Sequence, residues 1–290
     1  MKFNIMMIDP PDFPHTHFLN EAAKCFAYGI ESLGHDCCIT PNNFDVQRIN
    51  IIFGGHHIND PNQVKQLASA PTKYIVYQSK KLNAIVQPNA PSLPHFQQVY
   101  LPLMQHAVQV WEGVPEHAGL LQKAGCNVLP VRMGYHPDLN EIFKKPNPEF
   151  DFLFFGQVTQ YRQRQLLELE RRGHHVLTIH EDEAIFRNDL IASARVHLAL
   201  PRSEKITHLS HRRVCYLLNN ECLVVSERTT DQGWLQNCMV WADRNQWVQA
   251  CIHTLQRADR EQLRQHNIRN YQQIRVENIL RPAIDALNQG

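Results

Sequence analysis

Long apolar runs are missing from this sequence of 290 residues. A membrane-spanning helix needs about 18 or more consecutive apolar residues, and no such stretch occurs, so no transmembrane helix is expected. The apolar stretch at the N-terminus is too short for the core of a signal peptide, and Asp9 and three prolines follow it instead of a cleavage site. Together these absences predict a cytoplasmic protein.

An excess of charge of either sign is also missing. Lys and Arg number 29 and Asp and Glu number 28, and no run of five or more like charges appears. Affinity for nucleic acid or for an anionic membrane normally draws on a basic surface. The composition therefore gives no electrostatic support for either partner.

Metal-binding patterns are missing, although their usual ligands are abundant. The eight cysteines form no CxxC pair, and the 17 histidines form no HExxH motif. Structural zinc sites and catalytic zinc sites depend on spacings of this kind. We therefore expect reduced thiols and no bound metal.

The sequence does contain an alternating rhythm of short apolar runs and helical stretches. Such runs are typical of strands buried on both faces of a parallel sheet. Strands are expected over residues 3–9, 37–40, 49–54, 74–78, 108–111 and 127–131, and again over 150–155, 175–179, 196–200, 222–226 and 239–242. Helices are expected at 19–33, 162–172, 184–193 and 211–219, and from 246 onward. The rhythm predicts an α/β fold.

Two prolines interrupt this rhythm near its middle. Pro146 and Pro148 remove backbone donors and restrict the residues before them, which favours a boundary between residues 1–148 and 149–290. Each half then forms a Rossmann-like, doubly wound domain. Because open parallel sheets bind ligands at the carboxyl ends of their strands, we expect the two domains to face each other across a cleft. The helical C-terminal tail can cross back onto the first domain.

A rigid polar loop follows the first expected strand. Asp9, Asp12, His15 and His17 lie in this loop among the three prolines. Imidazole and carboxylate groups are suited to taking a proton from an acceptor hydroxyl. We take His15 as the candidate base, with Asp12 and His17 beside it; the alternative is that the histidines only cap the following helix.

A glycine pair follows the third expected strand. Gly54, Gly55 and His56 stand directly after a buried apolar run. A turn without side chains lets a ligand approach the backbone. We interpret these residues as lining the cleft, although pairs of glycines are common in ordinary turns.

The second half contains two strand exits that are followed by a helix with arginines in its first turn. Gly156 and Arg162 mark the first exit, and Ser210, Arg212 and Arg213 mark the second. Free amides at a helix start attract anions, and Arg adds a charged fork. Both exits are candidates for binding a diphosphate; the alternative is a surface rich in solvated charge.

These segments resemble the CgeB-like (spore maturation protein-like) glycosyltransferases, which have the GT-B fold. The resemblance rests on a succession of blocks over most of residues 50–230. They are YIVYQSKKL (74–82), YLPL (100–103), VWE (110–112), VRMGYHPDL (131–139), DFLFFG to Arg162 (151–162) and RRV to VVSE (212–227).

The resemblance implies transfer of a sugar from a nucleotide-sugar donor, without a metal or a separate cofactor. The donor is expected on residues 149–290 and the acceptor on residues 1–148. The donor diphosphate is expected to contact Arg162, Arg212 and Arg213, and the nucleoside to contact Glu227 or Tyr216. The acceptor stays open among a glycan, a protein, a small molecule and a modified nucleic acid.

Four residues, at three places in the chain, depart from the family pattern. Tyr216 stands where many relatives have Glu, Asn220 and Glu221 replace a turn of small residues, and Lys80 stands where an acidic residue is expected. Tyr216 and Glu221 keep open the alternative of a catalytically silent module that binds a nucleotide sugar. A different two-domain enzyme with a similar cleft, such as a nucleotide-sugar epimerase, is a further alternative.

Overall fold

The computed structural model describes residues 1–10, 19–78, 80, 82, 86–87, 90–180, 184–205, 209–229 and 233–288. The chain divides into two compact units. Unit 1 comprises Met1–Met133 together with Val276–Gly290, and unit 2 comprises Gly134–Arg275. Each unit contains one parallel sheet. No helix among the described residues has both the length and the apolar character that crossing a membrane requires.

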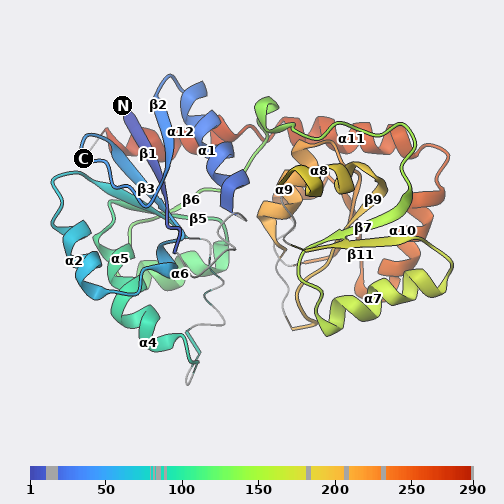
Figure 1. Cartoon of the computed structure of the whole chain (residues 1–290), viewed down its shortest axis with the longest axis horizontal. Coiled ribbons are helices and arrows are strands. Elements are labelled where there is room, and N and C mark those ends of the chain that lie inside the picture. Colours follow the sequence, from blue (N-terminus) through green and yellow to red (C-terminus); the bar gives the residue numbers. More distant parts are fainter. Residues whose placement is uncertain are drawn as a thin grey trace. The chain divides into compact units, whose positions relative to one another are not determined.

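The sheet of unit 1 has six parallel strands in the order β2-β1-β3-β4-β5-β6 (Figure 1). The strands are β1 (Lys2–Met7), β2 (Asp36–Pro41), β3 (Ile49–Phe53), β4 (Tyr74–Gln78), β5 (Gln109–Glu112) and β6 (Val128–Pro130). In the register, Ile5 pairs with Ile39 on one side and with Ile51 on the other. The central strands are buried along their length because helices cover both faces.

The helices of unit 1 divide between the two faces of its sheet. They are α1 (Asn20–Ser32), α2 (Pro61–Ala68), α4 (Leu93–His95), α5 (Leu101–His106), α6 (Pro115–Lys123) and α12 (Val276–Leu287), with a π-helical turn at Phe96–Tyr100. Successive strand residues point to opposite faces. Phe53, Tyr77 and Trp111 meet Phe26 of α1. Their neighbours Ile52, Val76 and Val110 pack on the other side.

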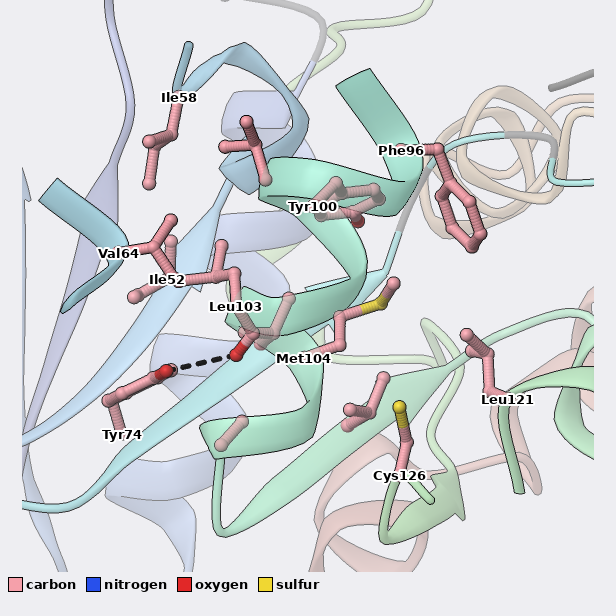
Figure 2. Close-up of a cluster of buried hydrophobic side chains, with 14 of the residues drawn as sticks. Ile52, Ile58, Val64, Tyr74, Phe96, Tyr100, Leu103, Met104, Leu121 and Cys126 are labelled. Atoms are coloured by element: carbon pink, nitrogen blue, oxygen red, sulfur yellow. Dashed lines mark hydrogen bonds between the residues drawn. The ribbon is translucent and has the colours of Figure 1, made fainter. Parts of the chain in front are cut away.

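That other side forms a core beneath the π-helical turn and α5, which Figure 2 shows in close-up. Tyr100, Leu103 and Met104 are at most 1% exposed. The Tyr74 hydroxyl donates a hydrogen bond of 2.9 Å to the Leu103 carbonyl. A buried hydroxyl that keeps a partner avoids the cost of lost solvation, so this bond lets an aromatic side chain complete an apolar core.

The expected return of the C-terminal tail to the first domain is confirmed. Helix α12 belongs to unit 1 and packs on α1. Gly29 of α1 permits this approach, because a Cβ at Gly29 would lie 2.7 Å from Leu280 Cδ1 and 2.9 Å from Val276 Cγ1. The Gln109 side chain also donates to the Ala283 carbonyl at 2.8 Å. The tail is therefore part of the core of unit 1.

The sheet of unit 2 has five parallel strands in the order β11-β10-β9-β7-β8. The strands are β7 (Phe150–Phe155), β8 (Val176–Ile179), β9 (Ala194–Ala199), β10 (Val224–Glu227) and β11 (Val240–Ala242). The helices are α7 (Gln160–Arg171), α8 (Ala184–Ala192), α9 (His211–Asn219), α10 (Trp247–Gln256) and α11 (Arg260–Gln272). All eleven strands predicted from the sequence are present, with ends that shift by at most two residues.

The core of unit 2 lies between its sheet and the pair α7 and α10. Phe152, Phe154, Val196 and Leu198 are at most 2% exposed, and the fully buried Trp247 of α10 packs with them. Figure 1 shows α7 and α10 together on this side of the sheet. Each unit is a Rossmann-like domain with one parallel sheet, and the predicted fold class of two such domains is confirmed.

The segment after Met133 is held by α9, inside unit 2. The backbone N–H of His136 donates to Asn219 Oδ1 at 2.9 Å, and those of Glu141 and Ile142 donate to Asn220 Oδ1 at 2.7 Å and 2.9 Å. The two units therefore divide at residues 133/134. Pro146 and Pro148 predict a boundary at 148/149. The observed division lies earlier in the chain because the side-chain amides of Asn219 and Asn220 hold residues 136–142 in unit 2.

The contact of α12 with α1 predicts that unit 1 tolerates no side chain at Gly29. We expect Gly29→Val to lower the free energy of unfolding by about 1 to 3 kcal/mol, the usual cost of overpacking. Gly119 of α6 is the matched control, because it is helical and a Cβ there would meet nothing within 4 Å. Gly119→Val should change stability by less than about 0.5 kcal/mol. Equal effects in urea denaturation would contradict the packing.

Candidate functional site

Gly156 lies at the carboxyl edge of the unit 2 sheet, where a side chain would meet Arg213. Gly156 follows β7 with φ 128°, and a Cβ there would lie 1.5 Å from Arg213 Nη1. Arg213 comes from the first turn of α9 and donates a hydrogen bond to the Phe155 carbonyl. The glycine therefore lets an arginine of a distant helix reach the end of β7.

Arg162 holds the loops that follow β7 and β9. Its side chain is 4% exposed. The guanidinium donates to the carbonyl of Leu200 at 2.7 Å, of Pro201 at 3.0 Å and of Gln157 at 2.8 Å. Burial, and then the charge of Arg202, lowers its pKa to about 10. The structure thus places the guanidinium on protein carbonyls and gives it a positioning role beside the expected diphosphate site.

Arg162, Arg202, Arg212 and Arg213 form an arginine cluster at this edge. Burial, and then the charges of Arg162 and Arg212, lowers the pKa of Arg213 to about 9. Like charges that are partly removed from water repel each other, and a nearby anion offsets that repulsion. The electrostatics of the arginine cluster therefore favour a bound anion.

The start of α9 adds backbone donors to this cluster. Ser210 occupies the N-cap position, but its hydroxyl makes no capping hydrogen bond within the part of the chain that is described. Amides in the first turn of a helix attract anions when no side chain satisfies them. A small pocket lies directly beside them, lined by Ser210 and Arg213 and by Phe154, Leu200, Leu209 and Leu217.

Glu227 ends the neighbouring strand β10 and is 2% exposed. Its carboxylate accepts a hydrogen bond of 2.8 Å from Arg244 Nε and another from the Tyr161 hydroxyl. Burial, and then the bond to Glu227, raises the pKa of Tyr161 above its ordinary value. Arg244 lies over the Tyr161 ring, 5.5 Å from its centroid. The pairing fixes Arg244, which is 43% exposed, at the same edge as the arginine cluster.

Tyr216 is buried inside unit 2. It sits in the second half of α9 and is 1% exposed. Its hydroxyl donates to Asn188 Oδ1 at 2.8 Å, and the guanidinium of Arg187 lies over its ring at 4.8 Å. Of the two residues proposed from the sequence to contact a nucleoside, Glu227 is the last residue of β10, and Tyr216 packs against Arg187, whose guanidinium also lies over the ring of Phe155 at the end of β7.

The carboxyl edge of the unit 1 sheet carries the expected glycine turn. Gly54 has φ 74°, and Gly55 is buried, with Leu103 2.8 Å from where its Cβ would be. The next two imidazoles, of His56 and His57, lie 4.1 Å apart between ring centroids. Burial, and then the charges of Lys80 and His95, lowers the pKa of His57. The candidates Asp12, His15 and His17 lie outside the described residues.

A buried polar network at the same edge was not found from the sequence. Glu112, at the end of β5, is 2% exposed. It accepts hydrogen bonds of 2.7 Å from Gln78 Nε2 and from the Val114 N–H, and its carboxylate lies 3.3 Å from His117 Nδ1. The sequence feature that could have indicated this network is that Gln78 and Glu112 are polar residues at the ends of two apolar strands. The network ties the loops after β4 and β5 to the start of α6.

Within the described residues, no group of three or more His, Cys, Asp or Glu side chains is arranged to hold a metal ion.

Comparison with known proteins gives a likeness of structure only. No family model and no curated protein matches the chain. The β-glucosyltransferase of phage T4, solved in complex with UDP and Mn²⁺, superposes with a TM-score of 0.59 at 13% identity, covering 98% of this chain and 100% of that one.

Two further solved structures are similar to a comparable extent. AviGT4, a glycosyltransferase involved in avilamycin A biosynthesis, gives a TM-score of 0.53 at 11% identity, covering 98% of this chain and 96% of that one. The α,α-trehalose 6-phosphate synthase of Burkholderia multivorans gives 0.53 at 10% identity, with 93% and 75% covered. These similarities show the fold that the chain shares with glycosyltransferases of the GT-B class.

The contact between Gly156 and Arg213 predicts a stability difference between two glycines. Both Gly156 and Gly173 have positive φ, but a Cβ at Gly173 would meet nothing within 4 Å. We expect Gly156→Ala to cost more than Gly173→Ala, by about 1 to 2 kcal/mol, because the Arg213 guanidinium must move and because a φ of 128° is more strained for alanine than a φ of 85°. Thermal unfolding of the two variants measures the difference. Matching costs would mean that Arg213 does not occupy this space.

Proposed function

We propose that this protein is a glycosyltransferase that takes its sugar from a uridine diphosphate sugar. The observation that carries the proposal is the arginine cluster at the carboxyl edge of unit 2, where a GT-B fold presents loops and helix starts. Breaking the bond between sugar and diphosphate leaves negative charge on the diphosphate. Fixed cations and amides stabilise charge that develops in this way.

In this proposal, Arg212 and Arg213 contact the diphosphate together with the amides at the start of α9. Arg162 positions the loops by its bonds to Leu200 and Pro201, because its donors already have acceptors in the protein. Gly156 keeps the approach open for Arg213. Glu227 and Arg244 lie where a nucleoside next to the diphosphate would reach.

We propose that the arginines supply the positive charge that a divalent metal supplies elsewhere. Two guanidinium groups and a helix start together provide about the charge that a departing diphosphate carries. One structural neighbour was solved with UDP and Mn²⁺. Neutralisation of the diphosphate by arginines and neutralisation by a metal can be distinguished by removing divalent ions. Binding to this protein should persist in EDTA.

We further propose that unit 1 holds the acceptor, that the chain is a divergent CgeB-like transferase, and that His15 activates the acceptor hydroxyl. His15 follows β1, whose carboxyl end lies at the same edge of the sheet as those of β3, β4 and β5. Proton removal by a positioned imidazole raises the rate by about 10² to 10⁴-fold. In a reaction that retains configuration, the donor phosphate itself would take the proton.

Two residues that motivated the silent-module alternative have partners within unit 2. Tyr216 is explained by its hydrogen bond to Asn188. Glu221 adopts φ 56°, and its carboxylate pairs with Lys144 and with Arg264. These two departures thus have hydrogen-bond and ion-pair partners within unit 2, which agrees with the active transferase that we propose.

The arginine cluster predicts the effect of removing its charges on nucleotide binding. Arg212→Ala and Arg213→Ala should each weaken the affinity for UDP about tenfold or more, because each removes a charge-assisted hydrogen bond. The double variant should show no binding in calorimetry with EDTA present. Arg171→Ala is the matched control, since Arg171 is 73% exposed at the far end of α7. Full UDP affinity in the double variant would overturn the donor site.

The proposed base predicts a loss of rate without a loss of donor affinity. His15→Ala should reduce release of UDP from the UDP-sugar substrate by about 100-fold or more. The affinity for UDP should stay the same, because the donor site lies in unit 2. Single-turnover kinetics with a panel of UDP-sugars measures the first quantity and calorimetry the second. A variant with unchanged turnover would reject His15 as the base.

A further inference from the structure

The winding of the unit 1 sheet reverses between β1 and β3. The chain runs from β1 to β2 on one side of β1 and then to β3 on its other side. Phe26 of α1, the helix after β1, packs on Phe53, whereas Val64 of α2, the helix after β3, packs with Ile52 on the opposite face. Ligands of open parallel sheets bind at such a reversal, outside the carboxyl ends of the strands. The residues that follow β1 and β3 are therefore placed to contact a ligand of unit 1.

Asp9 lies at this reversal and is exposed. The backbone N–H of Ile8 donates to the Phe53 carbonyl at 2.9 Å, so the pairing with β3 continues one residue beyond β1. A Cβ at Gly54 would lie 3.3 Å from the Ile8 carbonyl oxygen. The segments after β1 and β3 thus meet at Ile8 and Gly54, and Asp9 is the next residue along the chain. Because it is exposed, a ligand can reach it.

The side chain of Asn42 fixes the backbone of Asp9. Its Oδ1 accepts a hydrogen bond of 2.8 Å from the Asp9 N–H, and its Nδ2 donates one of 2.7 Å to the Asp9 carbonyl. Asn42 directly follows β2, and its own N–H donates to the Met7 carbonyl at 2.9 Å. One carboxamide therefore holds both polar backbone groups of Asp9.

This contact comes with backbone strain. Asn42 adopts φ 47°, in the left-handed region that glycine enters without a penalty and that asparagine tolerates. A glycine here would suit the backbone but could not hold Asp9. Strain of this kind is found where a local contact serves function. The hydrogen bonds to Asp9 are the contribution that only the Asn42 side chain makes.

A second carboxamide holds a loop at the same edge of the sheet. Gln78 ends β4, and its Oε1 accepts from the Lys80 N–H at 2.6 Å while its Nε2 donates to the Lys80 carbonyl at 2.8 Å. As with Asn42 and Asp9, one side chain holds both backbone groups of a residue two positions beyond a strand. Loops that are fixed before a ligand binds lose less entropy on binding. The edge is therefore preorganised.

We propose that Asp9 contacts the acceptor and that Asn42 is the residue that positions it. The inference rests on the proposed transferase reaction. A hydroxyl has one hydrogen, which His15 takes from the reacting group, so the Asp9 carboxylate accepts a hydrogen bond from an adjacent hydroxyl of the acceptor. A water molecule that replaces the acceptor offers its second hydrogen instead. Acceptors with adjacent hydroxyls, which are sugars and other polyols, meet this requirement.

The test measures release of UDP by the full chain from the UDP-sugar that it turns over fastest, with water as the acceptor. Asp9→Asn should lower the rate about tenfold or more, because a hydrogen bond to a charged group is lost. Asn42→Gly should lower it about tenfold through misplacement of Asp9. The Tm of Asn42→Gly should stay within about 2 °C, because glycine suits the backbone. The affinity for UDP should not change in either variant.

A double variant separates positioning from a general structural role. If Asn42 acts through Asp9, then Asp9→Asn combined with Asn42→Gly should be no slower than Asp9→Asn alone. Asn43→Gly is the matched control, since Asn43 takes part in the local bonds through its carbonyl; its rate should stay within about twofold. Losses that multiply in the double variant, or full turnover by Asp9→Asn, would overturn the inference and leave the transferase proposal standing.

Acceptor preference tests the adjacent hydroxyl. Glycerol should speed UDP release by the unmodified chain more than 1-propanol does at the same concentration, and Asp9→Asn should remove the difference. Equal effects of the two alcohols on the unmodified chain would reject the role of Asp9. If the unmodified chain releases no UDP from any UDP-sugar, the proposed function itself fails, and the inference fails with it.

Discussion

Parallel pairing of buried strands is the constraint on which the rest of this structure depends. It directs every carboxyl end of a sheet to one edge, so residues far apart in the sequence meet there. In unit 2 this brings Gly156, which follows β7, to Arg213 of α9. In unit 1 it brings Gln78 of β4 to Glu112 of β5. Polar groups gather at these edges because the strands themselves leave no room for them.

Buried cations at such an edge must be balanced by acceptors. Arg162 is balanced by three backbone carbonyls, which is why it can be 4% exposed. Arg213 has one carbonyl and two cationic neighbours, and its pKa is lowered accordingly. The difference separates Arg162, whose donors have carbonyl acceptors within the protein, from Arg213, for which we propose a bound anion. Two arginines that look alike in sequence therefore have different roles.

The alternation of apolar runs with turn residues predicted the strands well, because a strand that is buried on both faces is a continuous apolar run in the sequence. It did not predict which side chains and backbone groups contact each other. Arg162 carries the same signal as Arg212, and only the three-dimensional course of the loop after β9 shows which carbonyls it meets. The proline pair at 146 and 148 indicated a boundary, but Asn219 and Asn220 hold residues 136–142 against unit 2. The pairing of Glu112 with Gln78 likewise needs the strand order.

Helix α9 connects the two edges of unit 2. Its first turn carries Arg212 and Arg213, and its last residue, Asn219, holds the segment that leads in from unit 1. Glu221 follows at φ 56°, a conformation that favours glycine, and its contacts to Lys144 and Arg264 oppose that strain. Because the proposed anion contacts lie in the first turn of α9 and the amide contacts lie at its last residue, both depend on the placement of one nine-residue helix.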